Sequence, residues 1–345
     1  MVMVIRFCHG YVKMAIGMAA ALWLGIPGGT SAAEVRYRGV NLSGLEFGNA
    51  TGEFGTAYTV PDEGQFAYWG ETVGATIVRI PFPWERLEPV PGGGFDEAYL
   101  ALLQQAVGAA RAHHMIVILD MHNYAAFGGR HLKDGNIPAQ LFADTWRRLA
   151  EQVGDREGVW LGLMNEPHGI APVKWAAYSQ QAVTALREGG VTNRLLISGS
   201  AWSGAHSWRS SGNAAAFEGF DDPLNDFAFD VHQYLDANHS GTSGEAVSGA
   251  GGKVLRDITD WARSEGVSLF LGETGAASPQ IEGQEHALEE LSTMLDFMND
   301  NDDVWLGWTL WGAGPWWPES YHFEINPGPD GAHDPVIEKL LEYFQ

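Results

Sequence analysis

The segment VWLGLMNEPHGI (159–170) decides how this chain folds, because its apolar run stops abruptly in polar residues. Residues 159–164 are too few for a helix and too apolar for an edge strand, so we expect a buried strand. Pro167 lacks a backbone N–H and ends the ladder. Glu166 is therefore expected at the C-terminal tip of a strand. An isolated Asn-Glu-Pro tripeptide is more often an ordinary turn, so other segments of the chain must distinguish a turn from a functional strand end.

Seven further short apolar runs recur along the chain, with starts roughly 33 to 45 residues apart. They are GVNLSG (39–44), ATIVRIPF (75–82), MIVILDMHN (115–123), RLLISGS (194–200), FAFDVHQYLD (227–236), SLFLGETG (268–275) and VWLGWTLWG (304–312). Amphipathic stretches at 97–113, 139–152, 175–188, 254–265 and 287–298 separate most of the runs. This alternation predicts a single-domain α/β fold, a (β/α)8 TIM barrel. A doubly wound sheet is disfavoured, because no G-x-G-x-x-G follows the first run.

A Gly/Ser-rich segment (239–252) lies between the sixth and seventh runs. Its composition is typical of an interdomain linker. A barrel cannot be divided at that point, so we expect a long loop between a strand and the following helix.

The first 33 residues have the pattern of a secretory signal peptide. Arg6 and Lys13 precede an apolar stretch (14–26), and small residues end in Ser31-Ala32-Ala33. The apolar stretch is too short for a confident membrane span. We expect cleavage after Ala33 and a secreted domain, 34–345, that makes no membrane contact. Cleavage would also remove Cys8, the only cysteine, and with it any disulfide.

The charge balance limits the possible partners. The chain has 43 acidic and 20 basic residues, a net charge of -23 at pH 7. Such a surface argues against nucleic acid, whose binding depends on Lys and Arg at phosphates, and suits a neutral substrate. The 14 tryptophans indicate either an aromatic-rich core or binding of a flat ligand such as a sugar.

Polar residues end most of the apolar runs. They are Arg79, Asp120 to Asn123, Asn165-Glu166, His232 to Tyr234, Glu273 and Trp311. In a barrel these residues converge on the C-terminal mouth, where active sites lie. Convergent polar groups are hard to explain as packing, because burying them costs free energy unless they are paired.

Two of these polar residues, Glu166 and Glu273, are carboxylates expected on the fourth and seventh strands. Carboxylates facing each other at roughly 5 Å suit a retaining glycosidase, in which one attacks the anomeric carbon and the other acts as acid and base. The alternative is a pair of exposed loop acids.

Taken together, these motifs resemble glycoside hydrolase family 5, in particular its secreted bacterial endoglucanases (cellulases). The resemblance covers residues 39–317. Its carriers are GVNLSGLEFG, RIPFPWERLEP, DMHNYAAFGG, LMNEPH, VHQYLD followed by SGT, LGETG and GWTLWGAGPWW. Two departures, Ala126 where relatives often have a basic residue and Leu310 where they often have an aromatic one, concern the outer sugar-binding positions.

The resemblance implies a role for each matching residue. Glu166 matches the acid/base and Glu273 the nucleophile. Asn165 matches a residue that binds the sugar 2-hydroxyl, and the remaining matches support the site. Arg79 and Tyr234 match groups that hold the nucleophile ionised and oriented, His122 and His232 match imidazoles lining the cleavage subsite, and Trp311 matches the aromatic floor beneath the sugar.

The implied function is endo-acting hydrolysis of β-1,4-glucan with retention, by a monomer that needs no cofactor or metal. Trp202 and Trp208 after the fifth run, and Trp316 and Trp317 after the eighth, are expected to flank the glutamates as sugar platforms, although Trp208 is equally compatible with loop packing. His122 and His232 as metal ligands are a weaker alternative, because H-E-x-x-H and cysteine clusters are absent. Activity on mannan or mixed-linkage glucan, or a non-catalytic sugar-binding barrel, remain open.

Overall fold

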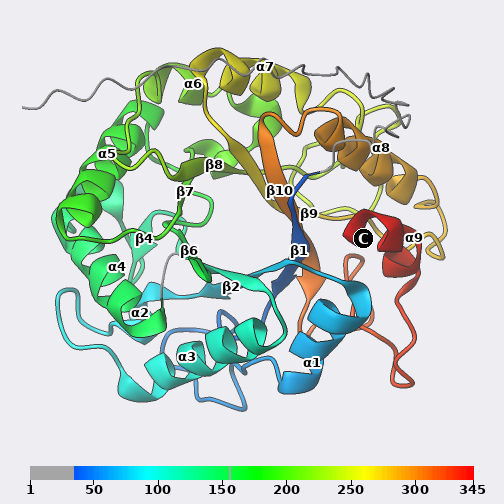
Figure 1. Ribbon diagram of the computed structural model, residues 1–345, viewed down its shortest axis with the longest axis horizontal. Helices are drawn as coiled ribbons and strands as arrows, with labels where there is room; N and C mark the ends of the chain where they lie inside the picture. The colour runs from blue at the N-terminus through cyan, green and yellow to red at the C-terminus, as the bar shows by residue number, and fades with distance from the viewer. Residues whose placement is uncertain (1–34, 155–156) are drawn as a thin grey trace, which may run out of the picture. The chain divides into compact units, whose positions relative to one another are not determined.

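The computed structural model describes residues 35–154 and 157–345, so the predicted signal peptide lies outside the described residues. Parallel strands close into a barrel in the order β1-β10-β9-β8-β7-β6-β3-β2, and helices surround them (Figure 1). The barrel strands are β1 (Tyr37–Leu42), β2 (Ile77–Phe82), β3 (Ile116–Met121), β6 (Val159–Gly162), β7 (Leu195–Ser198), β8 (Phe227–His232), β9 (Leu269–Thr274) and β10 (Trp305–Ala313). Each predicted apolar run supplies one strand, and the predicted (β/α)8 barrel is confirmed.

The five predicted helices are present with small shifts at their ends. They are α3 (Glu97–Ala112), α4 (Ala139–Val153), α5 (Pro172–Glu188), α7 (Arg256–Glu265) and α8 (Ala287–Asn299). The predicted long loop, 239–252, lies between β8 and α7. Within the described residues, no helix has the length and apolar character needed to cross a membrane.

Several elements were not predicted. They are α1 (Glu63–Ala67) with the adjoining π-helix η1 (Tyr68–Val73), α2 (Trp84–Leu87), the hairpin β4 (Ala126–Phe127) and β5 (Arg130–His131), α6 (Asn213–Ala216), α9 (Pro335–Phe344), and the 3-10 turns η2 (Leu132–Asp134), η3 (Ala201–Ser203) and η4 (Ala205–Ser207). Most are a single turn, too short for hydrophobic periodicity to reveal. The C-terminal α9 has the usual signals, with Asp334 capping its N-terminus and Pro335 in its first turn.

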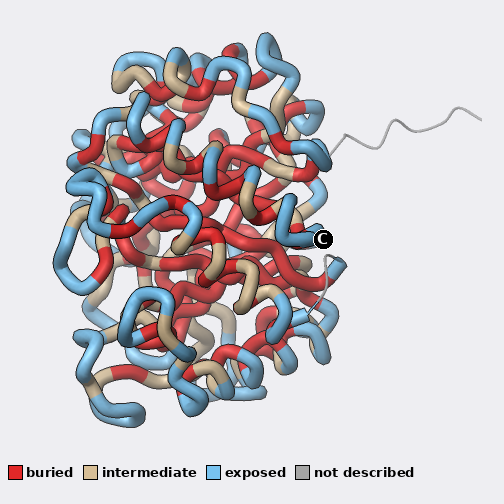
Figure 2. Tube along the Cα trace, turned by 90° about the vertical axis from the view of Figure 1, so that its left-hand side faces the viewer, coloured by how far each residue is buried: buried red, intermediate tan, exposed pale blue. Residues whose placement is uncertain are grey.

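Helix α3 illustrates how the sequence sets these elements. The Asp96 carboxylate accepts a hydrogen bond from the Tyr99 N–H at 2.9 Å and caps the helix. Tyr99, Leu103, Val107 and Ala110, spaced three or four residues apart, are all buried against the barrel. Figure 2 shows the same partition along the whole chain, with buried segments in the interior and exposed ones at the outer turns.

Side chains inside the barrel stack in layers, because alternate residues of each strand face inward. One layer is apolar, and its members are Ile77, Ile118, Trp160, Leu196, Ala228 and Phe270. Two residues farther along their strands, Arg79, Asp120 and Asp230 form a charged layer that is almost completely buried. Gly272 makes room for this layer, since a Cβ there would lie 2.1 Å from Asp230 Oδ1. The next inward-facing positions along the strands lie at the C-terminal mouth of the barrel.

Candidate active site

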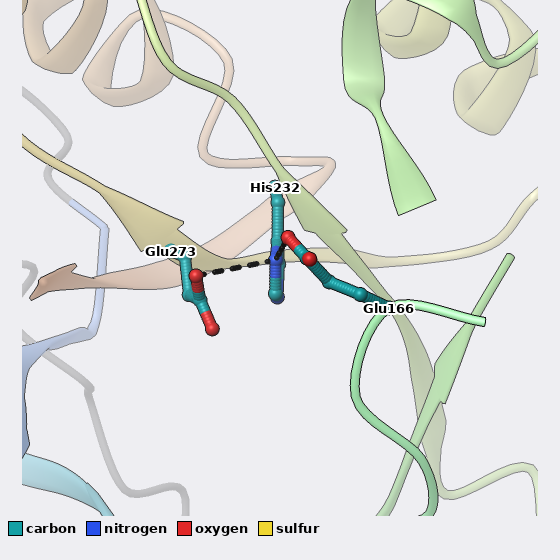
Figure 3. Close-up of side chains that lie close together, drawn as sticks. All are labelled: Glu166, His232 and Glu273. Atoms are coloured by element: carbon teal, nitrogen blue, oxygen red, sulfur yellow. Dashed lines mark hydrogen bonds and ion pairs between the residues drawn. The ribbon is translucent and has the colours of Figure 1, made fainter. Parts of the chain in front are cut away.

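The two predicted glutamates come together at the mouth of the barrel. Glu273 lies in β9 and is 5 % exposed, whereas Glu166 follows β6. His232, the last residue of β8, lies between them (Figure 3). Its Nδ1 is 2.8 Å from Glu166 Oε1 and 3.5 Å from Glu273 Oε2. An oxygen of each carboxylate and a nitrogen of His232 all lie within 4.8 Å of one another.

Glu166 sits four residues beyond the last residue of β6 and not at the strand tip, which corrects the predicted strand end. Its backbone has φ +40°, a region that non-glycine residues rarely occupy. Hydrogen bonds on both sides hold this loop. Asn165 N–H donates to Met121 O (2.8 Å), Tyr124 N–H donates to Asn165 O (3.0 Å), and Trp202 N–H donates to Pro167 O (3.1 Å). The carboxylate of Glu166 is therefore presented from a fixed turn.

Arg79 connects the nucleophile candidate to the charged layer. One guanidinium nitrogen, Nη1, donates to Glu273 Oε1 (2.8 Å) and to Asn41 Oδ1 (2.7 Å). The other, Nη2, donates to Asn165 Oδ1 (2.7 Å) and forms an ion pair with Asp120 Oδ1 (3.0 Å). Tyr234 Oη donates to Glu273 Oε2 at 3.1 Å. Both oxygens of Glu273 are thus fixed by donors before any ligand binds.

The sequence interpretation missed Asn41 and Asp230 as members of this network, and it placed Asp120 at the mouth without giving it a role. Asn41 also donates through Nδ2 to Gly272 O at 2.9 Å, so it ties β1 to the strand that carries Glu273. All three are polar residues in apolar strands, and Asp120 and Asp230 lie two residues before the histidines. That spacing places them on the same inward face as the mouth residues, which is the signal that could have identified them.

His122 forms a second cluster with Trp311 and Tyr124. Its Nδ1 is 2.7 Å from Asp120 Oδ2, and Tyr124 Oη is 3.0 Å from its Nε2. The His122 and Trp311 rings are stacked, with centroids 5.7 Å apart and an interplanar angle of 16°. These two predicted residues therefore form one wall next to the glutamates.

The buried charges set the protonation of the pair. Burial alone lowers the pKa of His232, but the charge of Glu273 and the hydrogen bond to Glu166 raise it to about 9. Burial raises the pKa of Glu166, yet the hydrogen bond and charge of His232 outweigh this and hold that pKa below its usual value. These shifts favour a charged His232 that donates from Nδ1 to an ionised Glu166 at neutral pH.

Two cavities lie at the mouth of the barrel. The Trp202 cavity, of 560 Å³, is lined by Glu166, Trp202, His206, Ser207, His232, Tyr234 and His239 among others. The Trp311 cavity, of 640 Å³, is lined by Glu46, Phe47, Glu85, His122, Tyr124, Trp311 and Trp317 among others. Both volumes are in the range of small-ligand sites. Glu166 lines the Trp202 cavity, whereas His122 and Trp311 line the other cavity.

The four tryptophans predicted as sugar platforms lie in different surroundings. Trp202 is 55 % exposed in its cavity, and Trp317 lines the other cavity. Trp316 is 40 % exposed and lies outside the lining of both. The expectation that Trp208 forms a platform is wrong, because it is fully buried and packs on Phe229 with ring centroids 5.4 Å apart.

Among the described residues, Glu166, His232 and Glu273 form the group whose spacing would allow them to hold a metal ion. Glu273 accepts hydrogen bonds from Arg79 and Tyr234, and His232 Nδ1 is hydrogen-bonded to Glu166, whereas His232 Nε2 is buried without a hydrogen-bond partner.

Comparison with known proteins decides the family. The model of the family described as cellulase, glycosyl hydrolase family 5, matches residues 33–314. The chain belongs to this family. The predicted family and enzyme class, a glycoside hydrolase, are confirmed.

Relatives of this family 5 cellulase include proteins named as endoglucanases. Endo-beta-1,4-glucanase B of Emericella nidulans is 30% identical over 335 residues, covering 96% of this chain and 98% of the relative. The endo-beta-1,4-glucanase Xac0029 of Xanthomonas axonopodis pv. citri is 40% identical with a TM-score of 0.85, over 90% of this chain and 98% of that one. A structure of XacCel5A in complex with cellopentaose has the same TM-score, 0.85, at 41% identity, over 90% of this chain and 99% of that one.

Proposed function

We propose that this family 5 cellulase is a secreted, monomeric endo-β-1,4-glucanase that hydrolyses internal bonds with retention of configuration. The observation that carries the proposal is the pair of carboxylates with oxygens within 4.8 Å of each other. That spacing leaves no room for an attacking water between sugar and base, which an inverting enzyme needs, and suits direct attack by one carboxylate.

The different partners of the two glutamates support different roles. Glu273 is held at both oxygens by Arg79 and Tyr234 and so keeps a fixed, charged orientation toward the anomeric carbon. Glu166 is hydrogen-bonded to His232 Nδ1 at 2.8 Å, so a group that can exchange a proton with it lies next to it, which suits an acid/base. In the first step, Glu273 forms a bond to C1 while the C1–O bond to the leaving sugar breaks and Glu166 protonates the departing oxygen. In the second step, Glu166 accepts a proton from water, which attacks C1 and releases Glu273.

The rest-state position of the proton is consistent with this sequence of steps. Glu273 is the strongest of the charges that raise the pKa of His232. Its negative charge disappears as it bonds to C1, so the imidazole holds its proton less tightly at that moment. The proton then moves along the 2.8 Å hydrogen bond toward Glu166 and on to the leaving oxygen.

The two cavities support cleavage within a glucan chain. The Trp202 cavity adjoins the acid/base and suits the leaving part of the chain, whereas the Trp311 cavity suits the part that becomes attached to Glu273. Aromatic faces in both cavities match the apolar faces of a β-1,4-glucan ribbon. The XacCel5A complex with cellopentaose adds support for a glucan substrate.

Azide rescue tests the assignment of the two glutamates. Glu273→Ala and Glu166→Ala should each lower turnover by several orders of magnitude, while Glu188→Ala on the exposed end of α5 serves as the matched control. With an aryl cellobioside, azide should give the inverted glycosyl azide from Glu273→Ala and the retained one from Glu166→Ala. The same stereochemistry from both variants would contradict the roles.

Substrate and export need their own measurements. We expect rapid viscosity loss on soluble cellulose and a higher kcat/KM there than on mannan or barley glucan. Preserved viscosity with release of glucose alone would indicate exo action, and preference for mannan would move the assignment to that specificity. The exported protein should begin at Glu34, as the domain 34–345, and an intact Met1 would contradict cleavage.

A further inference from the structure

Three loops at the mouth of the barrel share an unusual backbone conformation. They follow the neighbouring strands β3, β6 and β7, and they contain Tyr124 and Ala125, Glu166, and the turn 201–203, respectively. All six residues have φ between 40° and 57°, a region that residues other than glycine rarely occupy. Such backbone strain persists only where the surrounding structure fixes it, so contacts between the loops must hold them.

Two backbone hydrogen bonds join these loops through the residues on either side of Glu166. Tyr124 N–H donates to Asn165 O at 3.0 Å, and Trp202 N–H donates to Pro167 O at 3.1 Å. The second bond fixes the backbone of Trp202 but leaves the rotamer of its indole to side-chain contacts. The direction of the indole matters, because Trp202 is 55 % exposed and lines the cavity named after it.

The half-buried His168 supplies a contact that holds the indole. Among the ring pairs of residues 35–154 and 157–345, Trp202 takes part in one, a stack on the His168 imidazole with centroids 4.9 Å apart and an interplanar angle of 14°. Flat rings stacked in this way attract each other. His168 does not line the Trp202 cavity. It therefore supports one face of the indole without reaching the space that a ligand would occupy.

The loop after β3 in turn holds the His168 ring. The Tyr124 ring lies 6.1 Å from it, and the ring of His131, in β5, meets it edge-on at 5.9 Å. Gly169 makes room for His131, since a Cβ there would lie 3.2 Å from His131 Nε2. Ring contacts thus run from the hairpin β4–β5 through His168 to Trp202. Loss of the flat His168 ring would interrupt them at the middle.

We propose that His168 is a positioning residue that holds the Trp202 indole in the orientation in which it binds the leaving part of the glucan. The proposal rests on the proposed function, because it needs a glucan that extends into the Trp202 cavity. His168 makes no bond to the substrate. It keeps the indole from turning, so less conformational entropy is lost when the sugar binds.

Two replacements of His168 that differ in ring shape test this role. His168→Leu fills a similar volume without a flat ring, whereas His168→Phe keeps the ring. We expect His168→Leu to raise KM for soluble cellulose roughly three- to tenfold with kcat nearly unchanged, the effect of losing one ring stack. His168→Phe should keep the KM of the unaltered enzyme. His333→Leu is the matched control, because that imidazole also lies beside an aromatic ring, Tyr68, but lines neither mouth cavity.

Cellobiosyl fluoride separates this role from an effect on Glu166. Its leaving group is a single fluoride ion, so no sugar occupies the Trp202 cavity, and its second step still needs Glu166 to activate water. His168→Leu should therefore turn over the fluoride as fast as the unaltered enzyme does. In a Trp202→Ala background, His168→Leu should cause no further rise in KM for soluble cellulose, because the two residues act through one contact.

Three results would each overturn the proposal: an unchanged KM in His168→Leu, an equal rise of KM in His168→Phe, or additive effects in the double variant. Equal losses on soluble cellulose and on the fluoride would also overturn it, because His168 would then act on Glu166. Failure of the unaltered enzyme to accelerate hydrolysis of either substrate would instead contradict the proposed function.

Discussion

Replacing Arg79 by lysine keeps the positive charge but removes the two-pronged guanidinium. Arg79 is completely buried and makes three hydrogen bonds of 2.7–2.8 Å, to Asn41, Asn165 and Glu273. A single ammonium cannot reach all three acceptors at once. If the lysine ammonium pairs with Glu273, the amide oxygens of Asn41 and Asn165 lose this donor. Each buried acceptor left unsatisfied costs about 1–3 kcal/mol.

We therefore expect Arg79→Lys to lower the free energy of unfolding by about 2–6 kcal/mol, a large share of a typical 5–15 kcal/mol. Because Glu273 loses its fixed donor, kcat should also fall by about 100-fold, the effect of a misplacement near 1 Å. Arg79→Met should be worse, since it loses the same hydrogen bonds and also leaves Asp120 and Glu273 buried without their cation, and breaking a buried pair costs about 3–5 kcal/mol more.

Urea unfolding and turnover of an aryl cellobioside would measure the two effects. Arg263→Lys is the matched control, because that arginine is 44% exposed and pairs with Asp303 at the surface. Its stability should stay within about 0.5 kcal/mol of the unaltered protein. If Arg79→Lys retained both the stability and the turnover of the unaltered protein, the guanidinium group of Arg79 would not be what holds Glu273, and the reasoning would be refuted.

Two other predictions concern protonation and packing. Asp230 helps to raise the pKa of His232 to about 9. Asp230→Asn should therefore move the basic limb of the pH profile of kcat/KM to lower pH, because the imidazole then loses its proton at a lower pH. The control Asp260→Asn, at a side chain that is 77% exposed, should leave this limb in place, and a shift of the limb to higher pH in Asp230→Asn would contradict the account. Trp208→Ala should destabilise the fold by about 3–5 kcal/mol, whereas Trp202→Ala should raise KM for soluble cellulose with little loss of stability; the reverse pattern in unfolding and kinetic measurements would exchange their roles.

Much of the fold could be predicted from the sequence because the barrel strands are short and strongly apolar. Their regular spacing and the helical periodicity between them leave few topologies open. The glutamates could be predicted too, since polar residues at the ends of parallel strands converge at one edge. The charged layer was harder to predict, because Asn41, Asp120 and Asp230 are single polar residues within apolar strands. Their proximity to Arg79 is evident only in the three-dimensional structure.

Loop conformation accounts for what the sequence could not predict. Trp202 and Trp208 lie six residues apart in one Ser- and Gly-rich segment. Ala201, Trp202 and Ser203 all have positive φ, between 54° and 57°, and this left-handed turn presents Trp202 to the cavity. Trp208 follows it and packs inside the shell.

The central claim, a double displacement by Glu273 and Glu166, is tested most directly by the configuration of the first-formed product. Proton NMR during hydrolysis of an aryl β-cellobioside by the unaltered enzyme distinguishes the two anomers before they interconvert. The account predicts that β-cellobiose appears first and the α anomer only later, by mutarotation. Initial formation of α-cellobiose would show a single displacement by water and would contradict the account.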